Sequence, residues 1–301
     1  MPLSTFTRRI FLTSLFAVAA GALVPAWAAE FRSERISVTT EGEGNDVILI
    51  PGLGSSPRVW REMVRAVPGY RYHLVQIAGF AGHARGGNTE GTVSAPVAEE
   101  IARYIASRRL DRPAVIGHSM GGTVGMMLAA RHSDALSGLM VVDMLPFLGA
   151  MFGPPGTSAA SIAPTADSLL TQMRAAEPAA RQSRTVAALN NMIDTVSMRA
   201  GAIDDSHKSD PDVTARAYHE LVVTDLRPEL GKISVPTTVL YVVPKAPGFT
   251  EESIDAGYKA GYAPLKGVAL KRIPSSGHFI MWDQSVQFQA EVKGFLGRLK
   301  R

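Results

Sequence analysis

One serine stands in a setting that is typical of a nucleophile. The segment 114–118 is short and apolar, as expected for a buried strand, and it leads into the sequence Gly-His-Ser-Met-Gly around Ser119. Residues 123–130 follow and predict a buried helix. A strand, a tight turn with glycine two residues before and after a serine, and a helix make up a nucleophile elbow. This pattern predicts that Ser119 attacks a carbonyl carbon.

The two glycines of this turn, Gly117 and Gly121, meet a steric requirement. The backbone at such a serine is strained and the strand and helix run close together, so a Cβ at Gly117 or Gly121 would crowd the turn. The N-terminus of the helix would face the reacting carbonyl, where negative charge develops. The backbone N–H of Met120 is therefore a candidate oxyanion donor. His118 stands at a variable position of the turn, and we assign it no chemistry.

A histidine near the end of the chain is the candidate base. His278 follows the last predicted strand, residues 268–273, and precedes a predicted terminal helix over residues 283–299. A serine hydroxyl is a poor nucleophile until a neighbouring base takes its proton. We therefore predict that His278 activates Ser119.

The rest of the chain alternates strand and helix patterns. Strands are predicted over residues 35–40, 46–50, 72–77, 114–118, 139–143, 236–243 and 268–273. Helices are predicted between them, over residues 57–67, 94–107, 123–130, 211–226, 251–262 and 283–299. Continuous apolar runs are expected for strands that are covered on both faces. The pattern predicts an α/β fold with a mostly parallel, doubly wound sheet.

On the serine turn, its flanking elements and the late Gly-His, the sequence resembles the α/β-hydrolase superfamily of serine hydrolases. The resemblance covers nearly the whole chain after residue 28. Family members often carry His-Gly-x-Gly after the second strand, and here Pro51 replaces the histidine while the glycines are kept. The resemblance implies that the backbone N–H groups of Leu53 and Met120 form the oxyanion hole.

The resemblance leaves the acid of a catalytic triad open. Many family members place it a few residues after the strand that matches residues 239–243, where this chain has Lys245 and no carboxylate. Others place it after the strand that follows the elbow helix, which is the position of Asp143. Asp143 is the favoured acid, Glu252 and Asp255 are the alternatives, and a structural role for Asp143 at the entry to the next segment is the competing interpretation.

A change in composition marks an insertion at residues 149–208. Its Ala-, Met- and Leu-rich segments predict helices over 166–176 and 181–198, and the resemblance implies a helical cap over the pocket. The core would then comprise residues 29–148 and 209–301. Four methionines would give the cap an adaptable apolar lining: Met151, Met173, Met192 and Met198.

The glycine-rich loop after residues 72–77 departs from the family pattern. His83 and Arg85 are candidates to face the pocket from this loop. An isolated histidine and arginine among glycines are more typical of a solvated turn.

The implied activity is hydrolysis of a carboxylic ester of a small, largely apolar substrate through an acyl-serine, with no metal or organic cofactor. The same residues serve hydrolysis of lactones, amides or a carbon–carbon bond, and fold does not decide among them. A non-catalytic binding module of the same fold is a further alternative, which the intact serine and histidine disfavour. Dehalogenases and epoxide hydrolases use an aspartate where this chain has Ser119, so both classes are disfavoured.

Residues 1–28 have the pattern of a signal peptide. Arg8 and Arg9 precede an apolar run, and Ala26-Trp27-Ala28 offers small residues for cleavage. The paired arginines resemble a twin-arginine signal, which predicts a periplasmic or secreted protein. An uncleaved N-terminal anchor is the alternative.

Composition limits the partners. The chain has no cysteine, which excludes a lipoprotein, disulfides and thiolate metal sites. Its formal net charge is +4, and Arg8 and Arg9 contribute two of these charges. Since no basic cluster stands out, we expect a small-molecule substrate, no nucleic acid and no stable membrane association after signal cleavage.

The export signal yields a first prediction. Residues 1–28, fused to a reporter that is active only when it is exported folded, should direct that reporter to the periplasm. Replacing Arg8 and Arg9 together by lysine should abolish export, because the paired arginines define the signal. Reporter activity in periplasmic extracts measures the outcome, and undiminished export of the double-lysine variant would contradict the twin-arginine assignment.

Overall fold

Seven strands form one sheet in the residues that the computed structural model describes, which are Met1, 31–154 and 156–299. The strands are β1 (Ile36–Glu41), β2 (Asn45–Ile50), β3 (Tyr70–Ile77), β4 (Ala114–His118), β5 (Gly138–Val142), β6 (Thr237–Tyr241) and β7 (Ala269–Arg272). Their order across the sheet is β1-β3-β2-β4-β5-β6-β7. Only β1 runs antiparallel to its neighbour among the described pairs, so the predicted α/β fold with a mostly parallel sheet is confirmed. Apart from Met1, the predicted signal peptide lies outside the described residues.

Helices connect the strands. The α-helices are α1 (Arg61–Ala66), α2 (Ser94–Arg108), α3 (Met120–Arg131), α4 (Ala159–Ala175), α5 (Pro178–Met192), α6 (Val196–Lys208), α7 (Pro211–Val223), α8 (Glu251–Gly261), α9 (Ile280–Asp283) and α10 (Ser285–Arg298). Short 3-10 helices are η2 (Pro57–Trp60), η3 (Gly86–Asn88), η4 (Ser133–Ala135), η5 (Leu148–Phe152) and η6 (Leu230–Lys232). None of the helices within these described ranges has both the length and the apolar character needed to cross a membrane.

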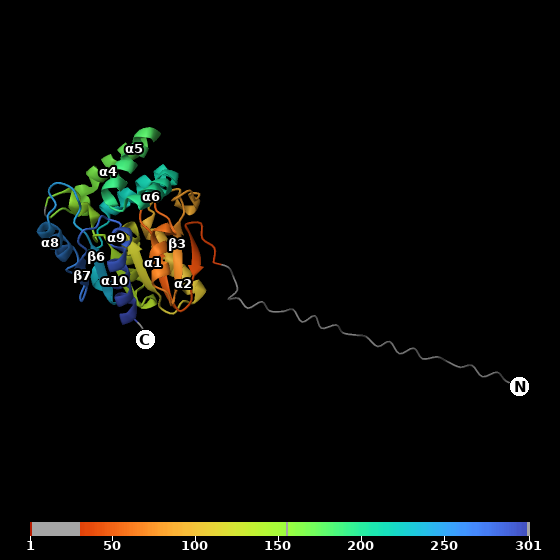
Figure 1. The fold of residues 1–301 in the computed structure, drawn as a ribbon. Helices are drawn as coiled ribbons and strands as arrows, with labels where there is room; N and C mark the ends of the chain where they lie inside the picture. Colours follow the sequence, from red (N-terminus) through yellow and green to blue (C-terminus); the bar gives the residue numbers. More distant parts are fainter. Residues whose placement is uncertain (2–30, 155, 300–301) are drawn as a thin grey trace. The chain divides into compact units, whose positions relative to one another are not determined.

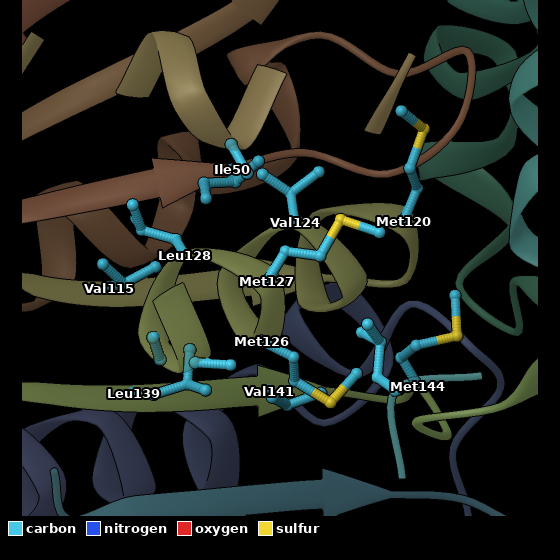
Figure 2. Close-up of a cluster of buried hydrophobic side chains, with 14 of the residues drawn as sticks. Ile50, Val115, Met120, Val124, Met126, Met127, Leu128, Leu139, Val141 and Met144 are labelled. Atoms are coloured by element: carbon cyan, nitrogen blue, oxygen red, sulfur yellow. The ribbon is translucent and has the colours of Figure 1, made fainter. Parts of the chain in front are cut away.

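The central strands are covered on both faces. Ile48 and Ile50 of β2 are buried in a cluster with side chains of α2 and α3. Val47 and Leu49 lie in a second cluster with side chains of α1 and α10. Successive side chains of a strand point to opposite faces, so helices pack against both sides of the sheet. Figure 2 shows the first cluster, in which side chains of α3 lie among those of β2, β4 and β5.

The turn between β4 and α3 has the tight geometry expected of an elbow. Ser119 adopts a φ of 52°, which is uncommon for a residue with a side chain. A Cβ on Gly117 would collide with the carbonyl oxygen of Gly121, and a Cβ on Gly121 would collide with that of Ile50. The predicted steric requirement for these two glycines is therefore confirmed.

The insertion between β5 and β6 differs from its predicted helix boundaries. The helix predicted over 181–198 is two helices, since α5 ends at Met192 and α6 begins at Val196. The intervening Ile193 is extended and fully buried, and the backbone N–H of Thr195 binds a side-chain carboxylate instead of continuing a helix. Tertiary contacts thus divide a segment that has a helical composition.

The start of α4 also differs from the prediction. The helix was expected from residue 166 and begins at Ala159. Ser158 and Ser161 form a capping box in which each side chain accepts the other's backbone N–H. Pro164 lies inside the helix and removes one backbone hydrogen bond without ending it.

Helices α4, α5 and α6 lie together beyond one end of the sheet (Figure 1). We refer to them as the cap helices. Helix α5 packs on α6, whereas α4 packs along α7. The cap helices therefore cover that end of the sheet.

Candidate active site

A cavity of about 910 Å³ lies between the cap helices and the carboxyl ends of the strands. Ser119, Asp143 and His278, the predicted nucleophile, favoured acid and predicted base, all line it. They follow β4, β5 and β7, whose carboxyl ends meet at one edge because the strands are parallel. The wall opposite includes residues of all three cap helices: Met173, Leu189, Met192, Ser206 and His207.

Asp143 and His278 are joined by a short hydrogen bond. The Nδ1 of His278 lies 2.6 Å from Oδ2 of Asp143. An ionised carboxylate can only accept a hydrogen bond, so the proton of a neutral His278 ring sits on Nδ1 and Nε2 carries the lone pair. The other oxygen of Asp143 accepts from the N–H of Val242 at 3.1 Å and from the hydroxyl of Tyr258 at 3.0 Å. Donors from three parts of the chain therefore fix the carboxylate.

Tyr258 has a role in this site that the sequence did not reveal. Burial, followed by the nearby charge of Asp143, raises the pKa of the Tyr258 hydroxyl well above its ordinary value. The hydroxyl therefore keeps its proton and acts as a donor to Asp143. In the sequence, Tyr258 lies four residues after Ile254 on the apolar face of a helix, a spacing that indicates only a core position.

The alternative acids lie elsewhere. Asp255 accepts from the hydroxyl of Tyr241 at 2.9 Å, and its Oδ1 lies 3.1 Å from Nε of Arg272. Glu252 is exposed on α8. Neither is among the described residues that line the cavity. Lys245 does line it, and its ammonium group pairs with Asp194 at 2.6 Å.

The two candidate oxyanion donors flank Ser119. Leu53 lines the cavity, and a Cβ on the adjacent Gly52 would lie 3.2 Å from the Cβ of Ser119. Met120 is the first residue of α3, so its N–H has no acceptor within the helix. Both backbone segments thus lie beside the predicted nucleophile.

Other predicted pocket residues divide into two groups. Of the four cap methionines, three line the cavity, whereas Met198 packs against the buried cluster on the α1 and α10 face. His83 and Arg85 are not among the described lining residues, and Arg85 pairs with Asp210 at 2.6 Å. The loop that carries them therefore has the solvated character that is typical of glycine-rich turns. In the described part of the chain, no group of three or more histidine, aspartate or glutamate side chains is arranged to hold a metal ion.

His118 is buried against His278, the predicted base, and the sequence did not indicate this contact. Its ring centroid lies 4.6 Å from that of His278, and its Nε2 donates to the carbonyl oxygen of His278 at 3.1 Å. Burial, and then the neighbouring His278, lower the pKa of His118 well below 6.5. A neutral ring at this point keeps positive charge away from His278. The contact joins residues 160 positions apart, which is why the local motif gave no sign of it.

Known proteins share this fold and its sequence pattern. The model of the Alpha/beta hydrolase family matches residues 47–291. A pimeloyl-[acyl-carrier protein] methyl ester esterase of Vibrio vulnificus (strain YJ016) is 32% identical over 108 residues, which span 36% of this chain and 40% of that protein. An esterase with the same description from Vibrio cholerae serotype O1 is 25% identical over 86% of this chain and 94% of its own length.

Solved structures show the same architecture. An esterase from Exiguobacterium antarcticum superimposes with a TM-score of 0.71 at 19% identity, covering 87% of this chain and 95% of that one. At this identity the similarity concerns the fold.

The buried His118 yields a prediction on pH. Below about pH 6.5 the unfolded chain binds a proton at His118 that the folded chain excludes, so this residue lowers stability as pH falls through that range. In a pH titration by NMR, the ring signals of His118 should stay those of a neutral imidazole from about pH 8 to about pH 5. The His118→Asn variant identifies these signals and should lose less stability on acidification than the parent. A His118 signal that titrates near pH 6.5 would contradict the assignment.

Proposed function

The chain belongs to the alpha/beta hydrolase family, and from that premise we propose that it is a serine hydrolase that cleaves carboxylic esters of small, largely apolar substrates. The observation that carries this proposal is the 2.6 Å pairing of His278 with Asp143 in the cavity that Ser119 lines. Nucleophile, acid and base occur in that order along the chain, as the fold requires.

In the first half of the reaction, Nε2 of His278 removes the hydroxyl proton of Ser119 as its oxygen attacks the ester carbonyl carbon. The carbonyl oxygen becomes an oxyanion and accepts hydrogen bonds from the N–H groups of Leu53 and Met120. One such donor is worth roughly 3–4 kcal/mol in other serine hydrolases. The tetrahedral intermediate then breaks its bond to the alcohol oxygen, which takes the proton from His278 as it leaves.

In the second half, a water molecule gives a proton to His278 and attacks the acyl-serine. The carboxylic acid departs and the proton returns to Ser119. Asp143 holds the imidazole in the required tautomer and stabilises the imidazolium that forms in each half. Its own charge is held by the donors Val242 and Tyr258, so the acid needs no rearrangement during the cycle.

The preference for an apolar substrate follows from the cavity wall. Apart from the proposed triad and seven polar residues of the cap, among them Arg181 and Arg184, the lining consists mainly of Leu, Met, Phe, Val and Ala side chains. An aliphatic or aromatic group buried there gains about 25 cal/mol per Å² of apolar surface. The methyl ester esterases among the relatives support an ester rather than an amide as the substrate. Lactones, amides and diketones are the competing substrates, and parallel assays of esters, lactones and amides rank them.

We also propose that the protein acts in the periplasm or outside the cell. This proposal rests on the twin-arginine pattern at Arg8 and Arg9 and on the small residues before the expected cleavage point at Ala28.

The proposed nucleophile and base should act as a unit. Ser119→Ala and His278→Ala should each lower kcat for a p-nitrophenyl ester by a factor on the order of 10³ or more, and the double variant should be little worse than either single one. Steady-state kinetics on the three variants measures this. Multiplicative losses would show that the two residues act independently and would contradict the mechanism.

The proposed acid is tested against matched carboxylates. Asp143→Asn keeps the shape of the side chain but presents an amide that favours the wrong histidine tautomer, so kcat should fall by orders of magnitude, about 10⁴ in the best-studied triad. Binding of an unreactive substrate analogue should change little, because the acid acts in the transition state. Glu252→Gln and Asp255→Asn remove carboxylates outside the cavity and should stay within a few-fold of the parent. If Asp143→Asn is folded and active while Glu252→Gln or Asp255→Asn is inactive, the acid is one of the carboxylates that follow β6.

A further inference from the structure

The carboxylate of Asp283 joins two segments that are far apart in the sequence. Its Oδ2 accepts a hydrogen bond at 2.9 Å from the backbone N–H of Gly277, the residue before His278. Its Oδ1 accepts at 2.8 Å from the N–H of Thr195, and both oxygens lie 3.0 Å from the N–H of Asp194. One charged group thus binds backbone donors of the histidine loop and of the α5–α6 connection, and charge-assisted bonds of this kind are stronger than neutral ones.

Close packing strengthens the same junction. A Cβ on Gly277 would collide with the carbonyl oxygen of Met192, the last residue of α5. The N–H of Phe279 donates to that same oxygen at 3.4 Å, and the hydroxyl of Thr195 donates to the carbonyl of Trp282 at 3.3 Å. The loop of His278 and the start of α6 therefore cannot shift independently without breaking several contacts.

The opposite end of α6 is attached to the loop that carries Leu53. Oδ2 of Asp205 accepts from the hydroxyl of Ser56 at 2.5 Å, and Oδ1 pairs with Arg58 at 3.2 Å. Ser209, just beyond the helix, has its hydroxyl 3.3 Å from the carbonyl oxygen of Gly54. Asp205 is only 5% exposed, so releasing it would leave a buried carboxylate without its partners.

We propose that α6 is a strut that fixes the loop of His278 relative to the loop of Leu53, with Asp283 and Asp205 as the positioning residues at its two ends. The helix spans 13 residues, and a helix of that length is about 20 Å long. The strut rests on the proposed function for its catalytic meaning, because the proposed base and the proposed oxyanion donor must act on the same ester group.

Residues of the strut also form part of the cavity wall. Ser206 and His207 of α6 and Met192 beside its start line the cavity, so a bound substrate touches the strut directly. Displacing reacting groups by about 1 Å costs on the order of 10²-fold in rate. A shift of α6 would therefore move part of the cavity wall together with the loops of His278 and Leu53.

The first test compares the position and the charge of Asp283. Asp283→Asn removes the charge and turns one oxygen into an amide that repels a backbone N–H, while Asp283→Glu keeps the charge but shifts it by one methylene. Both variants should lower kcat for a p-nitrophenyl ester by about 10- to 100-fold and change KM less than threefold. The matched control is Asp167→Asn, which removes an exposed carboxylate of α4 that pairs with His219. Full activity of Asp283→Glu would overturn the positioning role and leave a charge effect.

The second test uses the two ends together. If α6 transmits position, loosening either end already releases the other, so Ser56→Ala combined with Asp283→Asn should lower kcat by far less than the product of the single effects. Thr195→Pro offers a gentler change, since the φ of −72° at Thr195 suits proline and only the N–H to Asp283 and the hydroxyl are lost. It should lower kcat in the same direction. Multiplicative effects of the double variant would overturn the strut.

Hydrogen exchange separates this inference from the proposed hydrolase activity. In the intact protein, Asp283→Asn should speed amide exchange in residues 52–58, and Ser56→Ala should speed it in residues 275–283. Asp167→Asn should change neither segment. Faster exchange confined to the mutated end would overturn the strut whether or not the parent hydrolyses esters. A parent without ester turnover would overturn the proposed function while the exchange result still decides the strut.

Discussion

The hydrogen bond between Asp143 and His278 is the contact on which the site depends. It joins the loops after β5 and β7, and it forms only because β5, β6 and β7 are adjacent and parallel, so that their carboxyl ends meet. A buried carboxylate is costly unless donors surround it. Val242, which follows β6, and Tyr258 of α8 supply those donors. The carboxylate of Asp143 is therefore held by contacts that depend on the order of the strands, on the loops after them and on α8.

Burial shifts the pKa values of two side chains in the site, His118 and Tyr258, so that both stay neutral near pH 7. The rings of His118 and His278 lie 4.6 Å apart, yet burial holds the pKa of His118 well below that of an ordinary imidazole. Burial also holds the pKa of Tyr258 well above its ordinary value, which keeps its hydroxyl a donor. His278 is thereby left as the residue that takes up and returns a proton in the proposed cycle. An apolar cavity strengthens each of these electrostatic effects because little water screens them.

Local physics made part of this structure predictable from sequence. The glycines around Ser119 are required by backbone contacts within a few residues, and the apolar runs predicted the buried parallel strands. Asp143 was favoured because it ends a strand and Lys245 stands at the alternative position. The role of Tyr258 could not be predicted from the sequence, since its contact with Asp143 joins residues 115 positions apart. The break in the helix predicted over 181–198 could not be predicted either, because it depends on the carboxylate of Asp283 in α9, which binds the backbone N–H of Thr195.

The proposed mechanism requires Ser119 to act as the nucleophile and to become acylated during turnover. The most direct test is to treat the purified protein with a fluorophosphonate, which a nucleophilic serine attacks at phosphorus with loss of fluoride, and to locate the phosphonyl adduct by peptide mass spectrometry. A nucleophilic Ser119 should give one adduct per chain, on the peptide that contains Ser119, with ester hydrolysis lost in proportion to labelling. An unlabelled Ser119 in a protein that still hydrolyses esters, or full activity after complete labelling of Ser119, would contradict the proposed mechanism.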